Sequence, residues 1–277
     1  MTEINREGTT IALVNNKGGV GKTTTAVNLA ACLADDGHRV LLVDLDAQSS
    51  ASLSLGLTRA NLFPGSAEAI LDGVQPRDAI RASRISGLSI MPGSMSLASA
   101  DIYLADVENR ELVLHSALKQ LRSEYDFIVL DCPPSLGLLT VNALTSADFF
   151  LVPVTPDYLG FEGLLNLMDA VDRIKAGIGK AGSFLGIVLT MADYRQNVTK
   201  EIGGAIRQKY GHLVFLTEIK VNVRLKEAPS FGKAINEYDK GCSGAKAYRE
   251  FTKEALKRID QGDFQLRRRY PEVRSNP

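Results

Sequence analysis

Short apolar runs alternate with longer segments of helical periodicity along most of the chain. The runs that read as buried strands lie at 10–16, 39–46, 88–92, 126–134, 148–156, 183–191 and 213–220. Segments with helical periodicity lie at 22–35, 108–125, 160–177 and 243–260. Strands that alternate with helices are typical of a mostly parallel, twisted sheet covered by helices on both faces. The pattern therefore predicts the α/β class.

A single domain accounts for the length of the chain. The 277 residues fit one large α/β domain, and no repeat, low-complexity tract or flexible linker marks a boundary. We expect a short N-terminal arm at 1–9, one domain at 10–260 and a basic, flexible tail at 261–277. The N-terminus lacks the apolar core of a secretory signal, and no apolar run reaches the roughly 18 residues of a membrane span.

The three cysteines offer no disulfide framework. Cys32, Cys132 and Cys242 are far apart, odd in number and free of CxxC spacing, which favours a reducing compartment. The three histidines are equally scattered, so the sequence contains no recognisable zinc site. We therefore expect a cytoplasmic protein.

The formal net charge of zero hides an uneven distribution. From residue 195 to the end there are 18 Lys and Arg against 10 Asp and Glu, whereas the first 194 residues hold 14 and 22. Either solvated helix faces or a surface that binds a polyanion explains such a basic C-terminal third. Composition alone leaves both explanations open.

Residues 16–24, NKGGVGKTT, join the first predicted strand to the first predicted helix. A glycine-rich loop in this context binds phosphate, because its backbone N–H groups and the helix N-terminus point at the anion. We expect Lys22 to contact the β- and γ-phosphates of a nucleotide and the Thr23 hydroxyl to bind Mg²⁺. The common pattern has glycine where this chain has Asn16, which is followed by a second lysine, Lys17. Asparagine tolerates a positive φ, so we expect Asn16 to take the turn.

Three aspartates end the predicted strands around this loop. Asp44 and Asp46 end the strand at 39–46, and Asp131 lies near the end of the strand at 126–134. Acidic side chains at the carboxyl ends of parallel strands face the ligand crevice. We expect Asp131 to hold Mg²⁺ directly or through water. Alternation along a strand puts Asp44 and Asp46 on one side, where one would position the attacking water and the other would support the metal.

The segment KGGVGKTTT, with its extra lysine, resembles the deviant phosphate-binding loop of the ParA/MinD ATPases. Further segments resemble ParA/Soj-type partition ATPases, in order along about 10–260: RVLLVDLDAQ, YDFIVLDCPPSLGLLTVNALTSAD, VPVTPDYLGFEGL, GIVLTMAD and VRLKEAPSFGKAI. The loop alone fits MinD equally well, and VRLKEAPSFGK narrows the resemblance to ParA/Soj. The resemblance implies one P-loop ATPase domain that hydrolyses ATP slowly with Mg²⁺.

The resemblance also implies roles for individual residues. Lys17 matches a lysine that reaches across a dimer to the partner's nucleotide, where it and Lys22 would stabilise transferred charge. Asp46 matches the aspartate that positions the hydrolytic water, and Asn222 matches an asparagine near the adenine. The implied nucleotide loop is Lys17, Gly18, Gly19, Val20, Gly21, Lys22, Thr23 and Thr24, and the implied metal site is Thr23, Asp44 and Asp131.

The resemblance gives the basic C-terminal third an expected function. Arg195 and Arg224 match arginines that bind DNA non-specifically, and Lys220 and Lys226 lie close to Arg224 in the sequence. Such contacts would go to phosphates and would not depend on the base sequence. The three arginines at 267–269 either extend this surface or only keep the tail in solution.

The implied function is an ATP-dependent homodimer that binds double-stranded DNA non-specifically and positions or segregates cargo. A ParB-like or cargo-adaptor protein would stimulate hydrolysis, and the protein would lie on the nucleoid, with no membrane association expected. A MinD-like membrane-associated positioning ATPase is the alternative, since Tyr248, Phe251, Ala255 and Ile259 form an apolar stripe on the segment 243–260. An iron–sulfur reductase and a metabolic ligase or kinase are disfavoured by the cysteine spacing and by the segment EAPSFGK.

Overall fold

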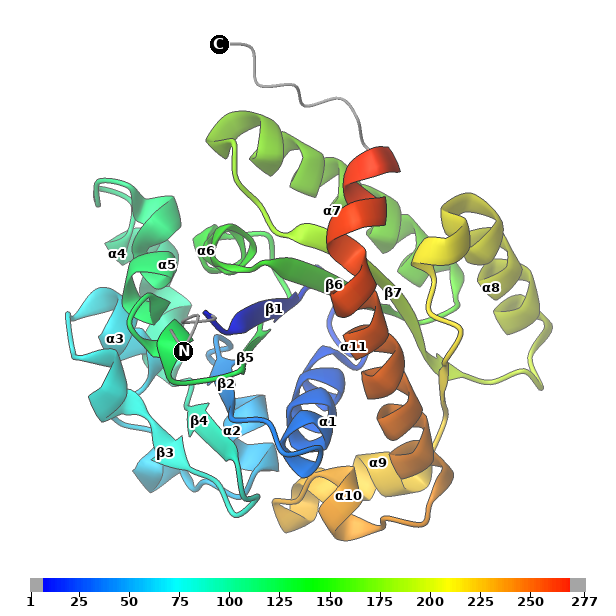
Figure 1. The fold of residues 1–277 in the computed structure, drawn as a ribbon, viewed down its shortest axis with the longest axis horizontal. Coiled ribbons are helices and arrows are strands. Elements are labelled where there is room, and N and C mark those ends of the chain that lie inside the picture. The colour runs from blue at the N-terminus through cyan, green and yellow to red at the C-terminus, as the bar shows by residue number, and fades with distance from the viewer. Residues whose placement is uncertain (1–6, 270–277) are drawn as a thin grey trace, which may run out of the picture.

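A single eight-stranded sheet forms the centre of the computed structural model, which describes residues 7–269, with side chains from 7 to 261 (Figure 1). The strand order is β3-β4-β2-β5-β1-β6-β7-β8, and every pair is parallel except β3 with β4. The strands are β1 (Thr9–Leu13), β2 (Val40–Asp44), β3 (Arg81–Ala82), β4 (Leu88–Met91), β5 (Phe127–Asp131), β6 (Phe149–Val154), β7 (Ser183–Ala192) and β8 (Ile219–Lys220). The predicted α/β class is confirmed.

Helices cover both faces of this sheet (Figure 1). They are α1 (Lys22–Asp35), α2 (Ser50–Ser54), α3 (Ser66–Leu71), α4 (Ala100–Tyr103), α5 (Val113–Leu118), α6 (Leu138–Ser146), α7 (Tyr158–Ile178), α8 (Asn197–Tyr210), α9 (Val223–Glu227), α10 (Ile235–Tyr238) and α11 (Ser243–Arg269). The first predicted helix, 22–35, has the bounds of α1. Because all strands except β3 run parallel, their carboxyl ends lie at one edge of the sheet.

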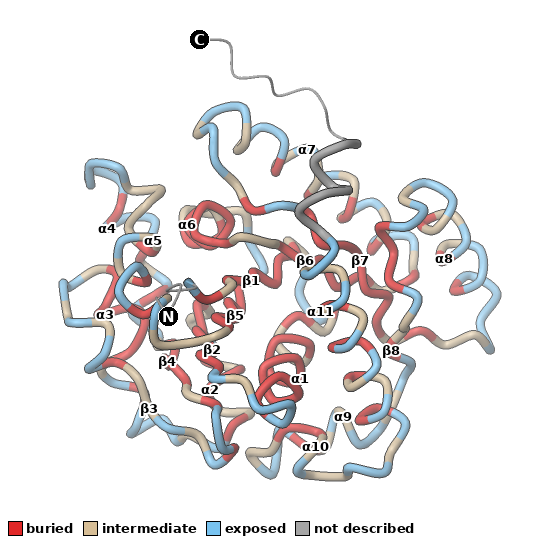
Figure 2. Tube along the Cα trace, in the orientation of Figure 1, coloured by how far each residue is buried: buried red, intermediate tan, exposed pale blue. Residues whose placement is uncertain are grey.

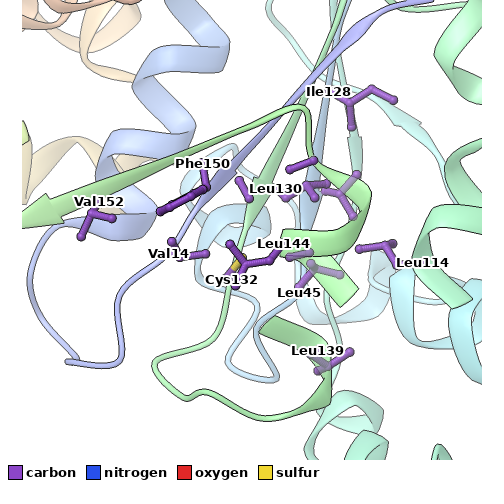
Figure 3. Close-up of a cluster of buried hydrophobic side chains, with 14 of the residues drawn as sticks. Val14, Leu45, Leu114, Ile128, Leu130, Cys132, Leu139, Leu144, Phe150 and Val152 are labelled. Atoms are coloured by element: carbon purple, nitrogen blue, oxygen red, sulfur yellow. The ribbon is translucent and has the colours of Figure 1, made fainter. Parts of the chain in front are cut away.

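Alternate residues of each central strand point into two separate apolar layers, one on each face of the sheet. In β1, Ala12 belongs to a layer that also contains residues of α3, α5, α6 and α7, whereas Ile11 and Leu13 belong to a layer that contains residues of α1, α2, α10 and α11. Figure 3 shows the first layer, in which Leu130 of β5 and Phe150 of β6, the strands on either side of β1, lie among helix residues such as Leu114 and Leu144. Because both faces are covered, the central strands are buried throughout (Figure 2).

Helix α1 is buried almost all round, because the sheet lies on one side of it and α11 on the other (Figures 1 and 2). The Tyr248 hydroxyl of α11 lies 3.2 Å from Oγ1 of Thr25 in α1. Tyr248, Phe251 and Ala255 are no more than 1% exposed, so the apolar stripe of α11 packs inside the fold. This burial removes the apolar face that the membrane-helix alternative requires.

The predicted strand at 213–220 is mostly wrong. Val214 forms an isolated bridge with β7, and only Ile219–Lys220 pairs as a strand. The backbone N–H groups of Leu216 and Thr217 instead donate to the carboxylate of Glu254, at 2.8 and 2.9 Å. Charged side chains of α11 thus replace strand pairing here, which an apolar sequence pattern does not reveal.

The predicted helix at 108–125 is broken into α5 and short 3₁₀ turns on either side of it. Asn109 takes a positive φ of 53°, and the side chain of Asn142 bonds to the backbone on both sides of the break. Asn142 accepts from the N–H of Leu114 and donates to the carbonyl of Arg110. Tertiary hydrogen bonds therefore override the helical periodicity.

The sequence pattern also assigns no helix to α6 or α8. Helix α6 has no charged residue, and its polar residues are buried, so it lacks the solvent-exposed polar face that marks a helix. Helix α8 contains Gly203 and Gly204, which weaken helical propensity. Of the predicted tail at 261–277, residues 261–269 continue the backbone of α11, and residues 270–277 lie outside the described part of the chain. The arginines at 267–269 belong to the backbone of α11, and their side chains are likewise outside the described part.

We predict that Phe251→Ala lowers the free energy of unfolding by about 3–5 kcal/mol, because it empties a fully buried site whose ring centroid lies 4.8 Å from that of Phe215. Urea unfolding measures this loss. Lys253→Ala, on the exposed side of the same helix, serves as the control and should change stability by less than about 0.5 kcal/mol. Equal effects of the two variants would contradict this packing of α11.

Candidate functional site

A phosphate-binding loop follows β1 and ends in α1. Gly19 and Gly21 have φ of 75° and 82°, which turns successive backbone N–H groups toward one side of the loop. Gly21 is also the N-cap of α1, and no side chain caps that terminus. The N-terminal N–H groups of the helix and its positive dipole end are therefore available to an anion.

Hydrogen bonds from two neighbouring strands hold the loop in shape. The amide of Asn15 donates to the carbonyl of Pro153 at 2.7 Å and accepts from the N–H of Lys17 at 2.9 Å. The Thr190 hydroxyl, from β7, donates to the carbonyl of Val20 at 2.7 Å. In the described part of the chain the non-glycine residues with positive φ are Ser49, Asn109 and Met191, so the expectation for Asn16 is wrong and glycines make the turn.

Two buried carboxylates lie beneath this loop. Asp44 and Asp131 end the neighbouring strands β2 and β5, pair with each other in the sheet register and are 0% exposed. Lys22, the first residue of α1, is only 6% exposed. The Thr23 hydroxyl lies close to Asp131, but neither oxygen of that carboxylate has a hydrogen bond of ordinary geometry among the described residues. Two unsatisfied buried oxygens fit the needs of a bound cation.

Burial changes the protonation of this pair. Desolvation raises the pKa of Asp131 to about 8, and the neighbouring charge of Asp44 adds to that rise. Desolvation also raises the pKa of Asp44 to about 6, although hydrogen bonds from Ser52 oppose it. A cation near Asp131 would supply the missing positive charge and return the carboxyl to its ionised form.

Asp44 and Asp46 do not share a strand. Strand β2 ends at Asp44, so the alternation expected along 39–46 does not apply beyond it. The carboxylate of Asp44 accepts from the N–H of Asp46 and from the N–H and hydroxyl of Ser52, which anchors the loop that leads into α2. Asp46 is partly exposed and accepts from the N–H of Gln48. It also lines a small cleft of about 150 Å³ together with residues of the loop after β5.

The second lysine lies at a different cleft. Lys17 lines a cleft of about 340 Å³ with the loop backbone, Asp157 and the side chains that follow β7. Its ammonium pairs with Asp157 at 3.1 Å, and one third of the Lys17 side chain is exposed. Asp157 was not identified from the sequence, although an aspartate directly before a helical segment is an N-cap signal.

Arg195 lies in the segment that precedes α8, Lys220 ends β8, and Arg224 and Lys226 lie in α9. Arg195, Lys220, Arg224 and Lys226 are all exposed. Arg195 is 85% exposed and binds both oxygens of Asp193, and Arg224 pairs with Glu227 at 2.9 Å. The structure therefore exposes all four residues but pairs both arginines within the chain.

The asparagine expected near the adenine caps a helix. The carbonyl oxygen of Asn222 accepts from the N–H groups of Arg224 and Leu225, and its amide donates to the hydroxyl of Ser243. The preceding residue, Val221, lines the same cleft as Lys17. The backbone of this turn thus borders the candidate nucleotide site, while the side chain of Asn222 is occupied.

The described residues contain no built transition-metal site. Within residues 7–261 no group of three or more His, Cys, Asp or Glu could hold a metal ion. Cys132 is buried in the apolar layer of Figure 3, away from any second cysteine ligand. Mg²⁺ suits the site at Asp131 and Thr23, because this ion is commonly held by one or two protein ligands together with nucleotide phosphates. No helix among the described residues is long and apolar enough to span a membrane.

Comparisons with known proteins match nearly the whole chain. A family model described as AAA domain matches residues 8–181. The chain is 42% identical to the sporulation initiation inhibitor protein Soj of Bacillus subtilis over 247 residues, which are 89% of this chain and 98% of that protein.

Two solved structures share the fold along its length. One, titled cobyrinic acid a,c-diamide synthase from Mycobacterium smegmatis with a bound ATP analogue and magnesium, has a TM-score of 0.81 at 30% identity, covering 92% of this chain and 96% of that one. The other, a complex of Cyanothece McdA with ATP, has a TM-score of 0.82 at 26% identity, covering 91% and 97%. Both neighbours were therefore solved with ATP or an analogue of it.

We predict that the stability of the metal-free chain falls as the pH rises from about 5 to about 8. Its folded state retains a proton on Asp131, with a pKa of about 8, that the unfolded state has released above about pH 4, so higher pH favours unfolding. The slope approaches about 1.4 kcal/mol per pH unit for one proton. Thermal unfolding of Asp131→Asn should show a shallower slope.

Asp126→Asn is the matched control for this measurement. A hydrogen bond from Arg39 holds the pKa of Asp126 low, so its carboxyl is ionised throughout this pH range and the slope should stay that of the unmodified chain. If Asp131→Asn and Asp126→Asn leave the same slope, Asp131 is not the proton-binding group.

Proposed function

Because the chain belongs to the ParA/Soj family of partition ATPases, enzymes that hydrolyse ATP with Mg²⁺, we propose that it works as an ATP-switched homodimer that binds DNA without sequence preference. The observation that carries the proposal is the different placement of its two loop lysines. Lys22 is buried beneath the loop, whereas Lys17 is partly exposed at a cleft on the loop's edge. Of the two lysines, Lys17 is the one exposed enough to reach a second molecule.

Each chain holds its own nucleotide through the loop. The backbone of Gly18, Gly19, Val20 and Gly21 and the start of α1, with Thr23 and Thr24, surround the phosphates, and Lys22 contacts the β- and γ-phosphates. The Val221–Asn222 turn borders the nucleobase.

Thr23 and Asp131 would hold Mg²⁺, which offsets the negative charge that develops on the phosphate oxygens. The two buried oxygens of Asp131 lack hydrogen bonds, and the Thr23 hydroxyl lies near them. Asp44 supports this arrangement indirectly, by anchoring the loop that carries Asp46. Asp46 orients the attacking water, and its partial exposure leaves it free to do so.

Dimerisation completes the site. Lys17 and Asp46 line separate clefts of one chain, which fits a lysine that acts on the nucleotide of the partner. When two copies face each other, each Lys17 meets phosphate charge that its own chain does not supply, so ATP binding and dimerisation become linked. Transferred charge is then stabilised by Lys22 from one chain and Lys17 from the other.

The dimer joins two copies of the basic surface formed by Arg195, Lys220, Arg224 and Lys226. DNA phosphates would replace the carboxylates that now pair with the two arginines, so binding is electrostatic and independent of base sequence. Two linked surfaces bind a polymer far more tightly than one. Hydrolysis separates the copies and releases the DNA.

The same cycle explains how such an ATPase positions cargo. We propose that a ParB-like or cargo-adaptor protein bound to the cargo stimulates hydrolysis, so that dimers leave the DNA where the cargo lies. The cargo then follows the remaining DNA-bound dimers, and the protein is associated with the nucleoid. The family relationship to chromosome-partitioning proteins supports this assignment.

We predict that Asp46→Ala still binds ATP, dimerises and binds DNA, but hydrolyses ATP roughly 10²- to 10⁴-fold more slowly, because the water is no longer oriented. Its complex with DNA should therefore outlive that of the unmodified chain after free ATP is removed. Stopped-flow dissociation from labelled DNA measures the lifetime.

Lys22→Ala provides the control, since a chain that cannot bind the phosphates should form neither the dimer nor the DNA complex. An Asp46→Ala dimer that leaves DNA as fast as the unmodified dimer would overturn the role given to Asp46.

A further inference from the structure

The ammonium of Lys17 is held by a carboxylate of its own chain. Nζ of Lys17 lies 3.1 Å from Oδ1 of Asp157, and the two side chains are 33% and 45% exposed. The backbone N–H of Lys17 is fixed separately by Asn15, so the pair fixes the direction of the side chain rather than the path of the loop.

Asp157 does not depend on this lysine for its own place. It is the N-cap of α7, and its Oδ1 accepts from the N–H of Gly160 at 2.7 Å. The positive end of a 21-residue helix also favours its negative charge. If Lys17 turns away, Asp157 therefore stays ionised, hydrogen-bonded and in position to take the lysine back.

Asp193 is the other carboxylate that lines this cleft. Both of its oxygens accept from the guanidinium of Arg195, at 2.8 and 2.7 Å. Asp193 is thus paired with Arg195, and Asp157 is the carboxylate of this cleft that pairs with Lys17.

We infer that Asp157 is a positioning residue that keeps Lys17 within its own subunit until the phosphates of a second, ATP-loaded copy compete for it. This inference rests on the proposed function, in which Lys17 crosses to the partner. In the proposed dimer the ammonium leaves Asp157 to reach the partner's nucleotide, so each dimer that forms breaks two such pairs. The pair thereby weakens dimerisation and disfavours contact between copies that lack ATP.

Asp157→Asn tests this inference cleanly, because asparagine caps a helix as well as aspartate does but carries no charge. Asp157→Ser is a second variant that keeps a cap and removes the charge. With a non-hydrolysable ATP analogue and Mg²⁺, sedimentation velocity should give dimer dissociation constants roughly 2- to 30-fold lower than for the unmodified chain, since two partly exposed ion pairs no longer oppose association.

Two controls define the effect. Asp126→Asn also removes one carboxylate and one exposed ion pair, with Arg39, but lies at the opposite end of β5 from Asp131 and should leave dimerisation unchanged. In a Lys17→Ala background, Asp157→Asn should have no further effect on the dimer, because the two residues act through one contact.

The outcomes separate this inference from the function on which it rests. If Lys17→Ala dimerises as well as the unmodified chain, the proposed role of Lys17 across the dimer is wrong. If Lys17→Ala fails to dimerise while Asp157→Asn and Asp157→Ser dimerise no better than the unmodified chain, the proposed dimer stands and the holding role of Asp157 is overturned.

Discussion

The buried carboxylate of Asp131 is the constraint around which the site is organised. It ends a central strand, lies beside Asp44 and Lys22, and has two oxygens without hydrogen bonds of ordinary geometry. Without a cation, burial keeps this carboxyl protonated near neutral pH, and its ionisation there costs stability. A cation held between this carboxylate and nucleotide phosphates removes that cost. Binding of nucleotide and metal is therefore coupled to the stability of the fold itself.

The same edge of the sheet carries every element that would change during the cycle. Lys17 and Asp157 lie on one side of the phosphate loop and Asp46 on the other, each beside its own cleft. The apolar layers beneath this edge are buried, and α11 packs against the side of α1 that faces away from the sheet. The loops that contact the phosphates are thus supported by packed layers. A change in those contacts therefore alters the loop surface available to a second copy or to DNA.

Local sequence patterns correctly predicted the central strands and the start of the first helix. Apolar runs located the central strands, and the glycine–lysine loop fixed the start of α1. Prediction failed where distant side chains decide the backbone, as Glu254 does at 216–217 and Asn142 does beside α5. It also failed for the geometry of Asp44 and Asp46, since β2 ends at Asp44, two residues before Asp46. The Lys17–Asp157 pair joins residues 140 apart, so no local pattern contains it.

Co-sedimentation with double-stranded DNA in the presence of ATP, ADP or no nucleotide tests the central claim most directly. The account predicts binding with ATP and Mg²⁺ alone, equal on two unrelated sequences, with the logarithm of the affinity falling linearly as the logarithm of the salt concentration rises. Equal binding with ADP and ATP, or no binding in any nucleotide state, would contradict an ATP-switched dimer that binds DNA.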